Sequence, residues 1–305
     1  MKLSNFILLT SILLSAPCLA FPFGSSTQIY DIQSGSSLNL AIADATYGSV
    51  TCAGTFTANS LTVSDDGGKD GSLTISDGGQ LTTITSLSAV SLDIQDENTV
   101  ASVGTNLDIT GATTISQGAT LNVTADATVA DLSISGDTTT ANFGGSFTSS
   151  GNLSLSDSCT LALDNAVNLN DVLIEDGSTL TLRSGSTLIV DGVLTINADT
   201  FVNQAMMIIE EGADLSSINE INIIMSDEAY DNWSTDSANY LISDEAGSMA
   251  VMEDIGFTIS NESGTASSDD ISYDQVVKTD AVPEPSTATL SLLALAALCA
   301  RRRRK

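Results

Sequence analysis

The 305-residue chain contains no histidine, nine lysines and arginines, four prolines, four cysteines and about 5% aromatic residues. Without histidine the chain lacks the commonest general base and the commonest metal ligand of proteins. The nine basic residues face 38 aspartates and glutamates, and the formal net charge of −29 repels nucleic acid and anionic lipid. The composition therefore predicts no nucleic-acid partner and no histidine-based catalysis.

Aliphatic residues alternate with Ser, Thr, Asp, Asn and Gly through most of the chain. β-Branched residues favour extended backbone, whereas Asn, Asp and Gly favour turns. The hydrophobic share of 42% and the mean hydropathy of +0.20 are sufficient for a sizeable core. The composition favours many short strands joined by turns.

One five-residue pattern, polar-aliphatic-polar-aliphatic-polar with small departures, recurs through the body of the chain. Strict alternation places both aliphatic side chains on one face of a strand. Turn-forming clusters such as Ser76-Asp77-Gly78-Gly79 separate the segments. The segments are SLTIS (72–76), SLDIQ (91–95), NLDIT (106–110), TLNVT (120–124), DLSIS (131–135), NLSLS (152–156), TLTLR (179–183), TLIVD (187–191) and VLTIN (193–197).

These segments predict an all-β fold in which residues 21–204 form a parallel β-solenoid, of the right-handed β-helix type. Each strand offers two inward aliphatic side chains, and similar short strands stack into coils that tolerate insertions at their turns. The segments recur irregularly, at roughly 8 to 20 positions, which an antiparallel β-sandwich also allows. That fold remains the alternative.

After about residue 204 the sequence becomes richer in Met, Ile and acidic residues. The open end of a solenoid has unpaired strand edges and exposed core side chains that need cover. We expect residues 205–260 to form an irregular β cap. Residues 261–282 are polar and predict an edge strand at Ile271–Val277 followed by a linker.

The N-terminus has the layout of a signal peptide. Lys2 supplies the positive start, Phe6–Leu14 the apolar stretch, and Ala20 a small residue suited to cleavage. The pattern predicts export through the Sec machinery and a mature chain that begins near Phe21. A buried N-terminal helix or strand is the alternative, and Pro17 disfavours lipidation of Cys18.

Two cysteines remain in the predicted mature chain, Cys52 and Cys159. A disulfide between them is permitted in an oxidising compartment, but a separation of 107 positions matches no framework pattern. Cysteine also packs readily as a small apolar residue. A disulfide and a pair of buried free thiols are both open at this point, and the second is favoured.

The C-terminus combines three features. Pro283, Glu284 and Pro285 disfavour helix, residues 287–300 are uncharged and rich in Leu and Ala, and a basic cluster follows. A helix over 287–300 would be about 21 Å long, short of the roughly 30 Å hydrocarbon core of a membrane. We expect a short transmembrane segment that holds the chain only transiently. The basic residues, which favour the cytoplasmic side, are Arg301, Arg302, Arg303, Arg304 and Lys305.

This order of features resembles the PEP-CTERM sorting signal of Gram-negative bacteria. The resemblance covers about residues 281–305 and implies recognition and cleavage by an exosortase. It also implies export, transient retention in the inner membrane, and delivery to the cell surface or extracellular matrix. The repeat body separately resembles the β-helical passengers of autotransporter-like proteins, in texture only.

The acidic residues show no catalytic or metal-binding pattern. Neighbouring side chains on a strand point to opposite faces, so adjacent carboxylates do not converge. We therefore expect no enzyme, catalytic residue, cofactor or metal. Calcium at the turn in Ser64–Ser76 is an alternative, although the order of Lys69, Asp70 and Gly71 departs from the calcium-binding β-roll pattern. The adjacent acidic pairs are Asp65-Asp66, Glu210-Glu211, Asp244-Glu245, Glu253-Asp254 and Asp269-Asp270.

Two classes of function are compatible with these observations. The first is a structural or adhesive surface protein whose rows of Ser, Thr and Asn bind partners such as exopolysaccharide or carry glycans. The second is a carbohydrate-active β-helix enzyme or a carbohydrate-binding protein. Sugars stack on aromatic rings, and the aromatic residues of the repeat body are too scattered along the sequence to indicate a binding platform. They are Tyr30, Tyr47, Phe56, Phe143, Phe147 and Phe201.

Overall fold

A computed structural model describes ten ranges of the chain. Residues 1–28 and 280–305, with the predicted signal peptide, Ala20, the Pro283-Glu284-Pro285 motif and the basic cluster, lie outside them. The described ranges are 29–65, 70–175, 177–198, 206–215, 217–218, 220–226, 241–244, 256–261, 264–266 and 277–279.

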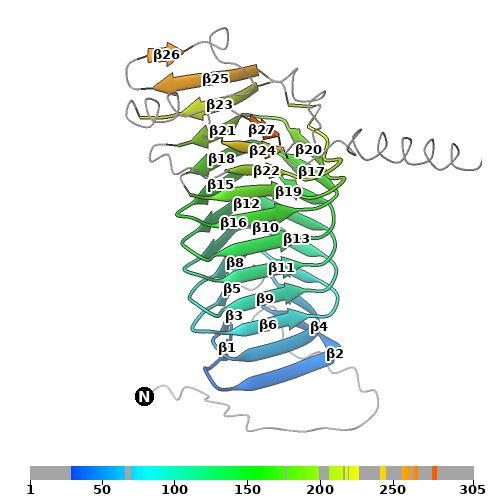
Figure 1. The fold of residues 1–305 in the computed structure, drawn as a ribbon. Coiled ribbons are helices and arrows are strands. Elements are labelled where there is room, and N and C mark those ends of the chain that lie inside the picture. Colours follow the sequence, from blue (N-terminus) through cyan, green and yellow to red (C-terminus); the bar gives the residue numbers. More distant parts are fainter. Residues whose placement is uncertain are drawn as a thin grey trace, which may run out of the picture.

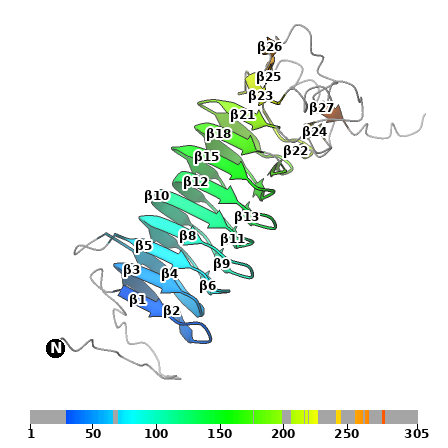
Figure 2. The same ribbon diagram turned by 90° about the vertical axis from the view of Figure 1, so that its left-hand side faces the viewer.

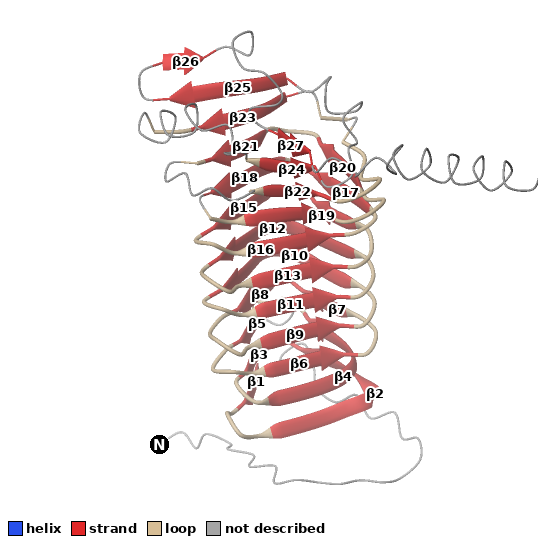
Figure 3. Cartoon of the chain, in the orientation of Figure 1, coloured by secondary structure: helices blue, strands red, loops and turns tan. Residues whose placement is uncertain are grey.

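The chain winds into a β-solenoid of about eight turns, which forms an elongated rod (Figure 1). Strands are the only regular elements in the described ranges (Figure 3). Every strand pair is parallel except that of β25 (Gly256–Asn261) with β26 (Gly264–Ala266). The predicted parallel solenoid is confirmed, and the antiparallel sandwich is wrong.

Three parallel ladders run along the rod. The first contains β1 (Ile29–Ile32), β3 (Ser49–Cys52), β5 (Ser72–Ile75), β8 (Ser91–Ile94), the ends of β10 (Leu107–Ser116) and β12 (Ala127–Ser135), β15 (Asn152–Ser156), β18 (Asp171–Glu175), β21 (Leu194–Asn197), β23 (Glu220–Ile224) and β25. Figure 2 shows its strands following one another from β1 to β23.

The second and third ladders lie on the other two sides of each coil. The second contains the starts of β2 (Ser37–Tyr47) and β4 (Thr55–Val63), then β6 (Gln80–Thr83), β9 (Val100–Val103), β11 (Thr120–Val123), β13 (Thr140–Phe143), β16 (Thr160–Leu163), β19 (Thr179–Leu182), β22 (Met207–Ile209), β24 (Ile242–Asp244) and β27 (Val277–Thr279). The third contains the ends of β2 and β4, the starts of β10 and β12, and β7 (Leu87–Ala89), β14 (Phe147–Ser149), β17 (Ala166–Leu169) and β20 (Thr187–Val190).

The three ladders explain the irregular spacing of the sequence pattern. SLDIQ lies on the first ladder, TLNVT on the second and NLDIT on the third, so distances between segments mix steps around a coil with steps along the rod. Within the first ladder, Thr113 pairs with both Leu92 and Leu132, so successive coils take 21 residues (92 to 113) and 19 residues (113 to 132). The following coils, Leu132 to Leu153 and Leu153 to Val172, again take 21 and 19.

Two coils together therefore form a 40-residue repeat that we did not anticipate from the sequence pattern. GSLTIS (71–76), GATTIS (111–116) and GNLSLS (151–156) occupy equivalent positions. The glycine N–H of Gly111 donates to the Val90 carbonyl at 2.8 Å, and that of Gly151 to the Ala130 carbonyl at 2.7 Å. A Cβ at these glycines would lie 2.7 and 2.9 Å from the same oxygens, so only glycine fits.

The turns between the first and second ladders alternate with the same period. Asp77, Gln117 and Asp157, each 40 positions apart, have φ values of 53°, 57° and 57°. The intervening coils instead have left-handed residues at Asp96 and Gly136, also 40 positions apart. Because Asp, Asn and Gly tolerate this conformation best, the turn composition sets the two alternating turn types.

The alternating turns are joined by a repeated hydrogen bond. Gly78 N–H donates to Thr99 Oγ1 at 3.0 Å, and Gly118 N–H donates to Thr139 Oγ1 at 2.8 Å. Both threonines are fully buried. Each bond connects a turn of one type to a threonine of the following coil, whose turn is of the other type. These bonds therefore require the two coil types to alternate.

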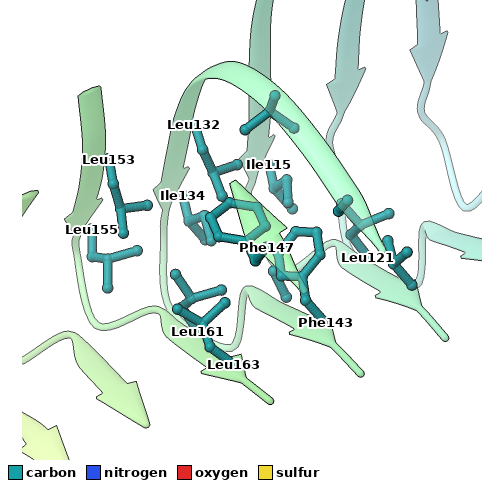
Figure 4. Close-up of a cluster of buried hydrophobic side chains, with 14 of the residues drawn as sticks. Ile115, Leu121, Leu132, Ile134, Phe143, Phe147, Leu153, Leu155, Leu161 and Leu163 are labelled. Atoms are coloured by element: carbon teal, nitrogen blue, oxygen red, sulfur yellow. The ribbon is translucent and has the colours of Figure 1, made fainter. Parts of the chain in front are cut away.

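The interior is a continuous aliphatic core that confirms the predicted alternation. Most short strands of the body have buried and less buried residues in strict succession, as in β5, β8 and β11. Figure 4 shows inward side chains of successive coils in contact, with Phe143 and Phe147 beside the leucines. Their ring centroids lie 4.4 Å apart, so two ladders meet in the middle of the rod.

The parallel ladders continue into the segment predicted as a cap. β22, β23, β24 and β25 each pair in parallel with the preceding strand of their ladder, and β26 then adds an antiparallel strand. β27 includes Val277, the last residue of the predicted edge strand, and pairs with β24, whereas residues 271–276 lie outside the described ranges. The boundaries at 204, 260 and 282 stay predictions.

Replacing the fully buried Leu180 by Asp should destabilise the rod by roughly 4 kcal/mol, because a carboxylate would be buried without a partner. The Thr181→Asp variant places the same charge on the outward position next to it and should be mild. Urea denaturation followed by circular dichroism measures both. Equal losses of stability in the two variants would contradict the assigned inward and outward faces.

Removing residues 111–150 deletes one 40-residue repeat and joins Thr110 to Gly151, which replaces Gly111. This shortened chain should fold and melt cooperatively, since the coil order is preserved. Removing residues 113–131 instead deletes one 19-residue coil and places two 21-residue coils next to each other. We expect a clearly lower melting temperature for the single-coil deletion, although it removes fewer residues. The reverse ranking would show that the two coil types are interchangeable.

Candidate functional site

The outer surface of the rod carries rows of hydroxyl and amide groups that bond from coil to coil. On the second ladder, Thr120 and Thr140 share a hydrogen bond of 3.2 Å between their hydroxyls. Asn142 Nδ2 donates to Asn122 Oδ1 at 3.0 Å on the same ladder. These contacts confirm that the polar positions of the sequence pattern face outward.

Arg183 is the basic residue among the side chains that the structure describes, and it is engaged on this surface. Its Nε lies 3.3 Å from Asp164 Oδ1, and its Nη2 lies 3.5 Å from Asn142 Oδ1. These contacts join three successive coils, at β13, β16 and β19. Arg183 is thus paired with Asp164 on this surface.

Several carboxylates accept hydrogen bonds from the backbone of a neighbouring coil. Asp131 Oδ1 accepts from Asn152 N–H at 2.8 Å, and Asp171 Oδ1 accepts from Val193 N–H at 2.9 Å. Asp131 lies within β12 and Asp171 begins β18, and each bonded N–H directly follows a glycine, Gly151 or Gly192, of the next coil. These aspartates, 40 positions apart, satisfy backbone groups that the extra residue leaves unpaired.

Of the acidic pairs considered from the sequence, Glu210-Glu211 is the one that lies wholly within the described ranges. Glu210 accepts hydrogen bonds from Ser184 N and Oγ at 3.1 and 3.2 Å, which is a structural role. Asp66, Glu245, Glu253, Asp254, Asp269 and Asp270 lie outside the described ranges. Over those ranges no three His, Cys, Asp or Glu side chains form a metal-binding group. Calcium at Ser64–Ser76 stays the alternative to the predicted absence of a metal, because residues 66–69 of that turn also lie outside the described ranges.

The pKa values of two carboxylates are shifted in opposite directions, each by a different cause. Burial, with repulsion from Asp96, raises the pKa of Asp93 on β8. Hydrogen bonds from the hydroxyl of Ser60 at 2.6 Å and the amide of Asn59 at 2.8 Å lower the pKa of Asp44. The packing of the coils thus disfavours the charged form of the Asp93 carboxyl.

Cys52 and Cys159 are free and fully buried, so the buried-thiol alternative is confirmed. The Cys52 thiol donates to the Gly54 carbonyl at 3.3 Å, and the Cys159 thiol to the Ile134 carbonyl at 3.2 Å. Burial raises the pKa of both thiols. Both thiols belong to the core and lack the exposure and low pKa of a reactive cysteine.

The aromatic residues are less scattered than their sequence positions predict. Tyr30, Tyr47 and Phe56 form one cluster near the start of the rod, with Tyr30 and Tyr47 stacked at 4.9 Å. Phe143 and Phe147 form the second cluster, and Phe201 lies outside the described ranges. Burial raises the pKa of Tyr47 to about 12, with a smaller effect of Tyr30. Tyr47, Phe56, Phe143 and Phe147 are buried in the core, and Tyr30 packs partly exposed against it.

A shallow groove of about 500 Å³ lies on the first ladder, across β15, β18 and β21. Asn152, Ser154, Asp171 and Thr195 supply its polar groups, and Leu173 and Val193 its aliphatic groups. This groove was not predicted from the sequence. The available signal was the placement of aliphatic residues at outward positions, in DVLIE (171–175) and just before LTIN (194–197).

The C-terminal residues 281–305 match the sequence family of the PEP-CTERM protein-sorting motif. The chain carries a PEP-CTERM sorting motif. No curated protein and no solved structure matches the chain. The resemblance of the body to autotransporter passengers therefore stays a prediction.

The PEP-CTERM motif indicates export, processing by an exosortase, and attachment at the cell envelope or surface. In the described ranges there is no helix long and apolar enough to cross a membrane. The predicted transmembrane segment at 287–300 lies outside them, as do the PEP-CTERM residues Pro283, Glu284 and Pro285. The transmembrane segment is thus unsupported and stays a prediction.

The raised pKa of Asp93 predicts a pH dependence of stability. The folded state binds the proton of this carboxyl more tightly than the unfolded state, so Asp93 lowers stability as pH rises from the unfolded pKa of about 4. Asp93→Asn should therefore raise the melting temperature at pH 7, and the gain should vanish below about pH 4. Thermal melts across this range measure it.

Asp108→Asn is the matched control, because it removes one charge from an exposed position on the third ladder. A stabilisation by Asp108→Asn as large as that by Asp93→Asn would assign the effect to net charge rather than to burial of Asp93.

Proposed function

We propose that this chain is a structural or adhesive protein of the bacterial surface or extracellular matrix. The observation that carries the proposal is the combination of a PEP-CTERM motif with an acidic β-solenoid whose outward rows are polar. In this proposal the Sec machinery exports the chain of a Gram-negative cell, and the inner membrane retains it transiently. An exosortase then removes the tail, and the rod remains outside.

The charge of the processed chain supports an exposed location. Loss of Lys2 and of the five terminal bases removes six of the nine basic residues and none of the 38 acidic ones. The mature charge would be 3 − 38 = −35. A surface of one sign keeps a long β protein soluble and opposes edge-to-edge association.

The contacts of the polar residues support a structural or binding role over catalysis. Asp131, Asp171 and Glu210 hold backbone groups of neighbouring coils, and Arg183 is paired with Asp164. In this proposal the chain is not an enzyme, and its rows of hydroxyls and amides provide many weak contacts along the rod. The groove on the first ladder favours carbohydrate binding as the adhesive mode.

Changing Pro283 and Pro285 to Ala should leave an unprocessed precursor in the inner membrane, because the extended backbone at this motif is the proposed recognition element. The wild-type chain should begin near Phe21, lack the residues from about Ser286 onward, and be degraded when intact cells are treated with protease. Intact-mass spectrometry of envelope fractions measures both ends. Identical masses and locations for variant and wild type would overturn the sorting step.

A deletion of Arg301–Lys305 separates topology from recognition. Without these bases the tail should pass through the membrane, which gives a secreted chain that retains Ser286–Ala300. For the adhesive role, cells lacking the gene should attach less to surfaces and to each other, and wild-type chain should restore attachment. The Pro283→Ala, Pro285→Ala chain should not. Unchanged attachment without the gene would contradict the adhesive role and leave the sorting step intact.

A further inference from the structure

We propose that the groove on the first ladder binds an uncharged polysaccharide chain. The proposal deepens the adhesive role above and rests on it for its biological setting, but the binding itself is a property of the rod. The groove crosses three strands, β15, β18 and β21, which covers about 10 Å along the rod at the usual strand spacing. Its volume of about 500 Å³ is within the range of ligand sites.

The aliphatic groups of the groove interrupt otherwise polar outward rows. Ser133 pairs with Ser154, Ser154 with Leu173, and Leu173 with Thr195, so Leu173 occupies a position that its neighbours give to hydroxyls. Val193, just before β21, is 48% exposed. Leu173 and Val193 therefore place two aliphatic side chains on an otherwise polar face, which indicates a binding face.

The polar groups around Leu173 and Val193 suit a sugar ring. Asp171 and Asn152 are exposed and can accept hydroxyl protons, and the amide of Asn152 can also donate. Ser154 and Thr195 can donate or accept. Asp171 already accepts the Val193 N–H, but a carboxylate has capacity for further donors. A pyranose has both hydroxyls and a C–H face, and the second can pack on Leu173 and Val193.

The charge of the groove decides between a neutral and an acidic polysaccharide. The groove holds the carboxylate of Asp171, and Glu175 ends the same strand, β18. No basic residue lines the groove, and the described arginine, Arg183, is engaged on the second ladder. An acidic polysaccharide would bring like charges together, both locally and against the whole rod. The occupant we infer is therefore neutral, with its hydroxyls as the donors to the carboxylate.

The test is affinity electrophoresis of the full chain in native gels that contain dextran, pullulan or hydroxyethyl cellulose as neutral probes. At least one neutral polymer should retard the wild-type chain, and alginate, which is acidic, should not. The Leu173→Asp, Val193→Asp variant should bind at least ten-fold more weakly. Ser133→Asp is the matched control, because it adds a carboxylate to the same row two coils away, and it should bind as wild type.

Circular dichroism and thermal melts confirm that the variants are folded, and Leu173→Ser provides a milder second variant that should also weaken binding. The proposal is overturned if none of the three neutral polymers retards the chain, or if the groove variants bind as wild type. If chitosan alone retards the chain, equally in all variants and not in the presence of salt, the retardation reflects attraction by net charge. That result would also overturn the proposal.

A second copy of this chain is the other occupant to test. If sedimentation shows a wild-type dimer that the Leu173→Asp, Val193→Asp variant dissociates, the groove is a self-association face and the polysaccharide proposal is wrong. Binding that succeeds in the gel while cells without the gene attach normally would retain the groove and refute the adhesive role. Absence of binding in the gel, together with weaker attachment of cells that lack the gene, would refute binding at the groove and retain the adhesive role.

Discussion

The parallel hydrogen-bond ladder is the constraint on which the rest of the structure depends. Each strand must lie about 4.8 Å above the equivalent strand of the preceding coil, so every coil has to return to the same place after one circuit. Between Leu73 and Val172 the chain meets this requirement with two alternating coil lengths, 19 and 21 residues, rather than one. The longer coil needs a bulge, and Gly111 and Gly151 provide it by lying against a carbonyl where a Cβ would clash.

The alternation determines where polar residues are needed. A bulge leaves backbone N–H groups without strand partners, and Asp131 and Asp171 accept two of them. The turns that stack along one edge likewise need left-handed residues, and their N–H groups reach Thr99 and Thr139 of the next coil. Part of the acidic and hydroxyl content of the rod is therefore a requirement of coil closure, and a carboxylate in that role, such as Asp171, keeps capacity for further donors.

The sequence sufficed for the fold class and for the inward residues, because two aliphatics per strand at a period of two leave few alternatives. Leu121 and Leu180 were identified as inward residues in this way, and both are fully buried. The 40-residue repeat was missed because NLDIT and TLNVT resemble each other but belong to different ladders. The groove was missed for a related reason: Leu173 and Val193 lie on adjacent coils, and only the register of β18 against β21 shows that these two outward aliphatic residues are neighbours.

The C-terminal end of the first ladder has a feature that bears on assembly. At the C-terminal end the first ladder finishes with the three-residue β26, which pairs antiparallel to β25 and so reverses the hydrogen-bonding pattern that a further parallel coil would require. Short and reversed strands of this kind limit edge-to-edge growth. The reversed strand β26 limits growth of the first ladder, whereas β27 ends the second ladder in a parallel pairing with β24. In the proposed adhesive role, the rod makes its contacts laterally, through the polar rows and the groove along its long side.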